Sequence, residues 1–264
     1  MLIMDFKSKQ KIAQLLEAEY VNNNTPEFIE CDPIQIPHNF KKQEDIEISA
    51  FLTAQIAWGK RSMIIRNGYN LMNIMDNSPY DFVLNASNNE LKKIDGFVHR
   101  TFNADDCRTE ILALRRFYMK YSNLGAYFES VFNTEGSIRN TLIQFRDDFL
   151  NSNHPPRFTR HISDVRKKSA AKRLNLLLMW MCRNDGRGVH FGLWNIPTSA
   201  LMIPLDVHCG NAARSMGLLN RKQNDWLAVE ELTLKLREFD PHDPVKYDFS
   251  LFGLSIQGKL KTCD

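Results

Sequence analysis

Apolar residues recur along the chain at helical spacing, and the strict alternation typical of β-strands is nearly absent. In the clearest amphipathic segment, Asp105–Tyr121, apolar side chains return every three or four residues. Further helices are predicted at Phe6–Val21, Asp45–Asn77 (long enough for two, with interruptions at Gly59 and Gly68), Leu124–Phe132, Ser137–Leu150, Ser169–Cys182, Asp206–Gly217, Asn224–Phe239 and Asp243–Gln257. The pattern predicts an all-α protein with about ten helices.

Composition agrees with a soluble globular protein, since 43% of the 264 residues are hydrophobic and 25% are charged. A chain of this length suits one large domain or two lobes that share a cleft. Its longest strongly apolar stretch, Leu174–Met181, is far shorter than the ~20 residues of a membrane span. Five scattered cysteines include no C-x-x-C pair, which argues against zinc ribbons and iron–sulfur loops. We therefore expect a reduced, cytoplasmic protein without a membrane contact.

Positive charge concentrates between Arg157 and Arg173, although the net charge is only +3. The run consists of Arg157, Arg160, Arg166, Lys167, Lys168, Lys172 and Arg173. Asp164 is the one acid within it. Such a run is either a solvated surface or a surface that contacts phosphates.

Lys172 stands in the first turn of a predicted helix whose later turns are apolar on all sides. The helix dipole, the neighbouring cations and partial desolvation all disfavour the protonated form of a lysine placed there. A neutral amine is what a Schiff-base nucleophile requires. The alternative is that Lys172 only extends the basic surface.

Asp206 follows Pro204 and precedes a predicted helix, so it is well placed to be an N-cap. Capping alone explains the residue. A fixed carboxylate at a helix start also suits the stabilisation of a positively charged sugar intermediate.

Two segments resemble the helix-hairpin-helix DNA glycosylase superfamily, typified by endonuclease III. They are AAKRLNLLL at 170–178 and PLDVH at 204–208, and in that superfamily a lysine opens a buried helix before a V-D-T/V-H element. FLTAQ at 51–55 is similar to its S-A-Q-type turn. GFVHRTF at 96–102 and DPVKYD at 243–248 resemble an uncharacterised bacterial family with the same expected fold.

The resemblance implies two all-helical lobes with an interlobe cleft across which DNA lies. One lobe would comprise residues 45–195, and the other residues 1–44 plus 196–264. Lys172 matches the lysine that attacks C1′ of the damaged nucleotide, and Asp206 matches the catalytic aspartate. Gln55 matches a residue that approaches the space vacated by a flipped base, and the basic run from Arg157 would lie beside the DNA.

One departure concerns the superfamily's hairpin, L-P-G-V-G-x-K, whose glycines let backbone N–H groups approach a phosphate. Here the lysine follows Lys168-Ser169-Ala170-Ala171, which contains no glycine, so basic side chains would have to take over the phosphate contact. Side chains that would complete the pocket, as stacking or hydrogen-bonding groups, are Trp58, His99, Trp194 and His208.

The function expected from these features is a monomeric base-excision DNA glycosylase, with or without AP-lyase activity, that needs no metal or cofactor. It would act on damaged double-stranded DNA, and a long connection after Lys172 points to oxidised purines. One alternative is a non-catalytic nucleic-acid-binding protein on the same fold. Another is a metal-dependent phosphohydrolase with ligands among His208, His242, Asp243 and Asp248.

Overall fold

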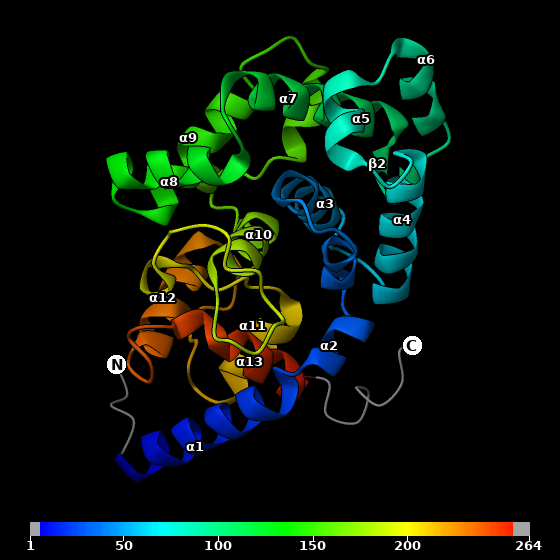
Figure 1. Ribbon diagram of the computed structural model, residues 1–264. Helices are drawn as coiled ribbons and strands as arrows, with labels where there is room; N and C mark the ends of the chain where they lie inside the picture. Colours follow the sequence, from blue (N-terminus) through cyan, green and yellow to red (C-terminus); the bar gives the residue numbers. More distant parts are fainter. Residues whose placement is uncertain (1–5, 256–264) are drawn as a thin grey trace.

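A computed structural model describes residues 6–255 and confirms the all-α class (Figure 1). Its α-helices are α1 (Phe6–Asn23), α2 (Pro26–Cys31), α3 (Gln43–Gln55), α4 (Arg61–Ile74), α5 (Pro79–Asn85), α6 (Asn88–Leu91), α7 (Ala104–Lys120), α8 (Leu124–Glu135), α9 (Ile138–Phe149), α10 (Lys172–Cys182), α11 (Val207–Ser215), α12 (Trp226–Arg237) and α13 (Asp248–Ser255). Short 3-10 turns are η1 (Pro33–Gln35), η2 (Pro37–Asn39), η3 (Lys92–Ile94), η4 (Pro156–Arg160), η5 (Val165–Lys167), η6 (Thr198–Ala200) and η7 (Pro244–Tyr247). The strands β1 (Val98–His99) and β2 (Phe102–Asn103) form one antiparallel hairpin.

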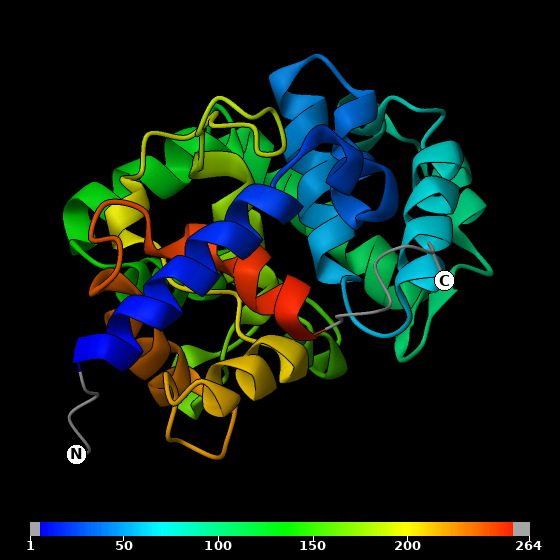
Figure 2. The same cartoon turned by 90° about the horizontal axis from the view of Figure 1, so that it is seen from below.

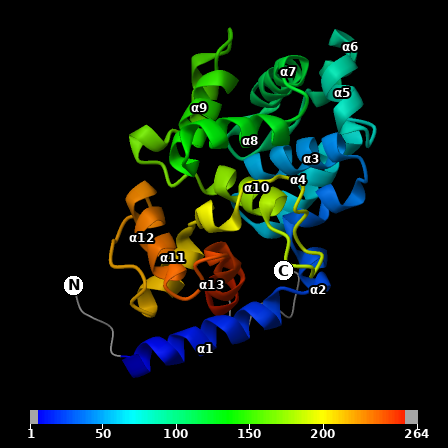
Figure 3. The ribbon, with the colours of Figure 1, turned by 60° about the vertical axis from the view of Figure 1, so that its left-hand side comes forward.

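Helix α10 lies in the middle of the molecule and packs along α3 (Figures 1 and 3). Helices α5 and α7–α9 gather on one side of this pair, and α11, α12 and α13 gather on the other. Seen from below, α1 crosses the outer face of the second group, alongside α13 (Figure 2). The start of α10 is thus close to both halves of the chain.

Two interruptions were predicted in the segment 45–77, and only one is present. Gly59 lies between α3 and α4 with φ of +104°, a conformation that favours glycine. Gly68, in contrast, lies inside α4, where an added Cβ would come within 3.0 Å of the Ile36 side chain. This glycine therefore allows close packing rather than ending a helix.

The start of the last helix also differs from the prediction. Asp243 makes no N-cap hydrogen bond, and the regular helix α13 begins only at Asp248. The Asp243 carboxylate instead accepts a hydrogen bond from the buried Arg183 guanidinium at 2.8 Å. The predicted helix end at Gln257, like Cys263, lies outside the described residues.

A fully buried carboxylate, that of Glu47 on α3, joins several elements of the upper half. Its two oxygens accept hydrogen bonds from the Tyr118 hydroxyl, the Trp194 indole and the backbone N–H groups of Leu124 and Gly125. The carboxylate thereby supplies acceptors for the Leu124 and Gly125 N–H groups at the start of α8, which have no partner within the helix. Glu47 thus fixes α3 against α7, α8 and the loop after α10.

No helix within residues 6–255 combines the length and the apolar character that crossing a bilayer demands.

Candidate functional site

The turn before Lys172 adopts a conformation that usually needs glycine. Lys168 has φ of +65° and Ala171 has φ of +48°, and each such residue costs a non-glycine side chain roughly 1–2 kcal/mol. Several hydrogen bonds hold the turn, among them the following two. Ala171 N–H donates to Ser169 Oγ at 3.2 Å, and Trp226 N–H donates to the Lys168 carbonyl at 3.1 Å. The second bond ties this turn to the start of α12.

The first turn of α10 is joined to the end of α3 through its two cations. The Lys172 amine donates to the Ala57 carbonyl at 3.1 Å, and the Arg173 guanidinium donates to the Gln55 carbonyl at 2.8 Å. Carbonyls at a helix C-terminus lack partners within the helix and carry partial negative charge, which is why they attract these cations. Lys172 as a whole residue is half-buried.

Asp206 is the N-cap of α11, as predicted. Its carboxylate accepts a hydrogen bond from Cys209 N–H at 2.9 Å, and its backbone carbonyl accepts one from the Asn224 side chain at 3.0 Å. The residue is half-buried. The side chain and the backbone carbonyl of Asp206 are therefore both held by hydrogen bonds.

A second carboxyl, that of Asp248, has a pKa that the charges of both Lys172 and Asp206 affect. The Cys209 thiol donates to Asp248 Oδ1 at 3.5 Å. Burial and the negative charge of Asp206 raise the pKa of Asp248 to about 7, while the positive charge of Lys172 and the thiol act in the opposite direction. The charges of both predicted catalytic residues, which come from different parts of the chain, thus act on one carboxyl group.

A third carboxyl joins this group from the segment before α3. Asp32 accepts a hydrogen bond from Ile34 N–H at 3.0 Å and lies 3.9 Å from the Arg61 guanidinium. Burial raises the pKa of Asp32, and the charges of Arg61 and Lys172 oppose that rise. We call these six residues, Lys172, Asp206, Asp248, Cys209, Asp32 and Arg61, the amine–acid cluster.

Much of the predicted basic surface is neutralised by acids from elsewhere in the chain. Arg157 donates to the buried Asp106 carboxylate at 2.8 Å, and Arg166 binds both oxygens of Asp147 at 2.6 and 2.9 Å. Arg173 is half-buried and donates to the Gln55 and His161 carbonyls, at 2.8 and 2.7 Å. In addition to Asp164, two acids from outside the run therefore pair with its cations.

Five of the seven cations of the run are exposed: Arg157, Arg160, Arg166, Lys167 and Lys168. Arg160 donates to the Thr101 carbonyl at 2.9 Å. Lys167 and Lys168 stand at the turn that precedes Lys172. Three of the five exposed side chains, Arg157, Arg160 and Arg166, already donate hydrogen bonds within the protein.

Gln55 and Trp58, at the end of α3, both carry buried polar atoms without a partner within residues 6–255. Gln55 is only 2% exposed, and its free acceptor is the amide oxygen. Trp58 is half-buried; its indole N–H is the free donor, and the Arg100 guanidinium lies 5.0 Å from its ring. Gln55 is thus an internal residue rather than a surface contact.

The other predicted pocket residues do not face the amine–acid cluster. Trp194 is 2% exposed, stacks on Phe128 and donates to Glu47 at 2.9 Å. His99 is fully buried and lies between the Asn67 side chain and the Trp58 carbonyl. Burial fixes both rings and excludes them as stacking surfaces for a base. His208 is exposed, one residue before Cys209 on α11.

Comparison with known protein families gives one match. The family described as a protein of unknown function, DUF2400, matches residues 32–257. The chain belongs to the DUF2400 family. No curated protein and no solved structure matches it. In this DUF2400 protein, every member of the amine–acid cluster lies inside the matched segment, from Asp32 at its beginning to Asp248 near its end.

Sequence reasoning missed three members of the cluster in this DUF2400 chain and gave a fourth, Asp248, a different role. Asp32 and Arg61 border short or irregular segments, and Cys209 was seen only as one of five scattered cysteines. Asp248 was named as part of the DPVKYD motif at 243–248 and as a possible metal ligand, and not as a neighbour of Asp206. An acid at the start of each of two helices was the one available signal.

The possible metal ligands of the DUF2400 chain are spread over the molecule. Asp243 is bonded to Arg183, Asp248 to Cys209, and His208 is exposed. Across residues 6–255, no three His, Cys, Asp or Glu side chains are arranged to hold a metal ion. The ligand set suggested for a phosphohydrolase is therefore not assembled.

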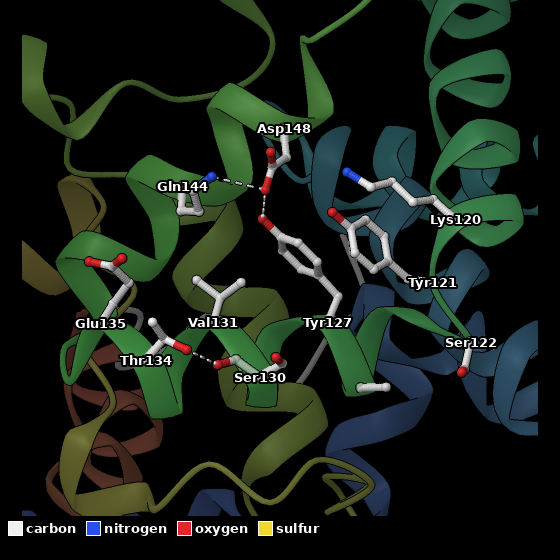
Figure 4. Close-up of a pocket in the computed structure, with 11 residues that line it drawn as sticks. Lys120, Tyr121, Ser122, Tyr127, Ser130, Val131, Thr134, Glu135, Gln144 and Asp148 are labelled. Atoms are coloured by element: carbon white, nitrogen blue, oxygen red, sulfur yellow. Dashed lines mark hydrogen bonds between the residues drawn. The ribbon is translucent and has the colours of Figure 1, made fainter.

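A surface pocket of about 530 Å³ lies apart from the cluster, between the end of α7 and helices α8 and α9 (Figure 4). Tyr127 forms part of its wall, and the Tyr127 hydroxyl donates to Asp148 at 2.7 Å. The Gln144 side chain donates to the same carboxylate at 3.1 Å. Asp148 is therefore held by the protein itself, and no member of the amine–acid cluster lines this pocket.

Proposed function

We propose that this protein is a DNA glycosylase with AP-lyase activity that acts on damaged double-stranded DNA. The Lys172 amine would attack C1′ of a flipped nucleotide, and the Asp206 carboxylate would stabilise the positive charge that develops on the sugar. The observation that carries the proposal is that Lys172 and Asp206, from separate parts of the chain, both act on the Asp248 carboxyl. The reaction needs an amine and a carboxylate that can both reach one sugar.

The turn before Lys172 supports the same proposal. In the hairpin pattern L-P-G-V-G-x-K, Lys168 occupies the position of the first glycine, and it has the left-handed conformation for which glycine is suited. At that one position, the backbone conformation is of the kind that the pattern's glycine would favour. The exposed Lys167 and Lys168 would supply the phosphate contact through their side chains.

The proposal also includes the coarse architecture. Residues 45–195 would form one lobe and residues 1–44 plus 196–264 the other, with DNA lying across a cleft between them. The protein would act as a monomer, without a cofactor, in the cytoplasm. Oxidised purines are the first lesions to test.

Borohydride trapping tests the chemistry. Reduction of an imine between Lys172 and C1′ links the protein covalently to the DNA strand, and the product is resolved by gel electrophoresis. We expect wild-type protein and the control Lys92→Ala, which changes an exposed lysine on η3, to be trapped on a duplex with an abasic site. Lys172→Ala should give no trapped product. Trapping that persists in Lys172→Ala would refute the assigned nucleophile.

The second candidate function is a non-catalytic nucleic-acid-binding protein. The hydrogen bond between the Lys172 amine and the Ala57 carbonyl favours it, because that bond must break before the amine attacks a sugar. Salt-dependent binding to duplex DNA, without trapping or strand cleavage on a panel of lesions, would support this alternative.

A further inference from the structure

We propose that the turn between β1 and β2 binds a phosphate of the DNA backbone through the guanidinium groups of Arg100, Arg157 and Arg160. This inference rests on the function proposed above, through its DNA substrate, and adds a contact outside the amine–acid cluster. Arginine suits the role, because its planar fork of N–H donors pairs with two phosphate oxygens at once. All three residues are exposed.

Two of these arginines converge on one oxygen at the turn of the hairpin. Arg157 Nη2 donates to the Thr101 carbonyl at 3.2 Å, and Arg160 Nη2 donates to the same carbonyl at 2.9 Å. Within residues 6–255, the Nε and Nη1 atoms of Arg157 and the Nη1 atom of Arg160 make no hydrogen bond. Several N–H donors beside this carbonyl therefore remain without an acceptor.

Arg100 adds a third guanidinium group at the same turn, one residue before Thr101. In the part of the chain that the structure describes, it makes no ion pair and no hydrogen bond, and its guanidinium lies 5.0 Å from the Trp58 ring. Its φ is +58°, a left-handed conformation in which glycine would be less strained. An arginine here thus has a backbone cost that its side chain must offset, and such strained residues are frequent at ligand-binding sites.

The charge of the three arginines is only partly balanced. Asp106, whose side chain is 2% exposed, is the one acid among residues 6–255 that pairs with any of them, and it binds Arg157 at 2.8 Å. Asp95 and Asp105, on either side of the hairpin in sequence, pair with Arg108 instead. Like charges around one turn repel one another, and a bound anion relieves that repulsion. A phosphate would supply the negative charge that the turn lacks.

The proposed phosphate site and the Lys172 amine contact the same short segment, residues 57–59. Lys172 donates to the Ala57 carbonyl at 3.1 Å. The Arg100 side chain lies against Gly59, where an added Cβ would be 3.0 Å from its Nη1 atom. Consecutive Cα atoms are about 3.8 Å apart, so the two contacted residues have Cα atoms at most about 8 Å apart. We therefore expect the bound phosphate within a few nucleotides of the reacting sugar.

The test is the dissociation constant for a duplex with one abasic site, measured by fluorescence anisotropy at several salt concentrations. Arg100→Ala should weaken binding about tenfold, the size expected for one hydrogen bond between charged groups. The slope of log Kd against log salt should fall by about one, because one phosphate contact is lost. The control Arg139→Ala, which removes an exposed arginine from α9, should change neither quantity.

Arg100→Gly separates phosphate binding from a role in stability. Glycine relieves the strain of a positive φ, so Arg100→Gly should melt at a temperature at least as high as Arg100→Ala. If the side chain binds a phosphate, both variants lose the same affinity for DNA. If it only covers the Trp58 ring, both keep the wild-type affinity, and the proposal is wrong.

Methylphosphonate linkages locate the phosphate, because each replaces one charged oxygen with a methyl group. The linkages within a few nucleotides of the abasic site are replaced one at a time on both strands. At one linkage, the replacement should weaken binding by wild-type protein about tenfold and binding by Arg100→Ala much less, since that variant already lacks the contact. Inorganic phosphate alone, titrated by calorimetry, should show no binding that depends on Arg100.

Three results would overturn the proposal. The first is an Arg100→Ala variant with the affinity and salt dependence of Arg139→Ala. The second is a methylphosphonate effect that is equal in wild-type protein and Arg100→Ala at every linkage. The third is binding of inorganic phosphate that depends on Arg100 while DNA affinity does not, which would describe a site for a small anion.

The outcome for the enzymatic function is read separately. If one of these results occurs and trapping still requires Lys172, the glycosylase function stands without the phosphate site. If wild-type protein binds DNA through Arg100 but is never trapped, the phosphate site stands and the enzymatic function is refuted. Wild-type protein that binds no DNA refutes both.

Discussion

Replacement of Glu47 by glutamine tests whether one buried carboxylate holds the upper half of the molecule together. The change preserves the size and shape of the side chain but replaces one acceptor oxygen with an NH₂ group. Every polar group around Glu47 is a donor. In one orientation, the new NH₂ group faces Leu124 N–H, and in the other it faces Gly125 N–H and the Trp194 indole.

The expected cost follows from the number of hydrogen bonds lost. Each buried donor left without an acceptor costs about 1–3 kcal/mol, and a bond to a charged group is at the upper end of this range. One or two such donors therefore lower the free energy of unfolding by about 2–5 kcal/mol. A domain is typically stable by about 5–15 kcal/mol, so the loss is a large share of the total.

Urea unfolding followed by far-UV circular dichroism measures this loss without relying on tryptophan fluorescence, which Trp194 would perturb. Gln43→Ala is the matched control, because it removes one half-buried donor to Glu47 and leaves the other hydrogen bonds in place. We expect this control to cost less than about 1 kcal/mol. If Glu47→Gln unfolds at the same urea concentration as Gln43→Ala, the assigned role of Glu47 is wrong.

Three other changes have expected outcomes. Gly125→Ala should lower the melting temperature, at a cost of about 1–3 kcal/mol, because the new Cβ would lie 2.5 Å from a ring carbon of Trp194. Arg183→Met should cost about 3–5 kcal/mol in urea unfolding, since it leaves two carboxylates without their buried cation. Asp248→Asn should stabilise the protein at pH 8 by at most about 4 kcal/mol, because the pKa of Asp248 is about 7 in the folded state against an ordinary value of 3.8.

The sign of the last effect is specific. A carboxyl whose pKa is raised by folding contributes its full stability below about pH 4 and loses it as the pH rises through 7. Stability of the wild type relative to Asp248→Asn should therefore fall between these pH values. A difference that is constant with pH would contradict the raised pKa. For Gly125→Ala and Arg183→Met, an unfolding midpoint within error of wild type would contradict the packing and the buried ion pairs, respectively.

The helices were predictable where local rules act alone. Sequence periodicity indicated a helix at 105–121, and α7 spans Ala104–Lys120, begun by a reciprocal pair of hydrogen bonds between Asn103 and Asp106. Asp206 was recognised as an N-cap for the same kind of reason. Asp243 is an equally suitable N-cap residue by local rules, yet its carboxylate accepts a hydrogen bond from Arg183 instead. A partner 60 positions away in sequence is invisible to a local rule.

The candidate site was only partly predictable for the same physical reason. The charges around Arg157 and Arg166 were counted among their neighbours in sequence. In the folded protein, these two arginines pair with Asp106 and Asp147, which are distant in sequence. Lys172 and Asp206 were found because each opens a helix. Asp248 shares that position at the start of α13, but its raised pKa depends on burial and on the charge of Asp206, which only the fold determines.

The three residues from Asn224 to Trp226 touch both sides of the proposed reaction. Trp226 N–H holds the Lys168 carbonyl, Asp225 pairs with Ser169, and the Asn224 side chain holds the carbonyl of Asp206. A phosphate that pulled on the turn at Lys168 would therefore also pull on the residue that bears the acid. In this way, contact with the backbone of a nucleic acid would influence the position of Asp206. The segment that transmits this influence contributes no reacting group itself.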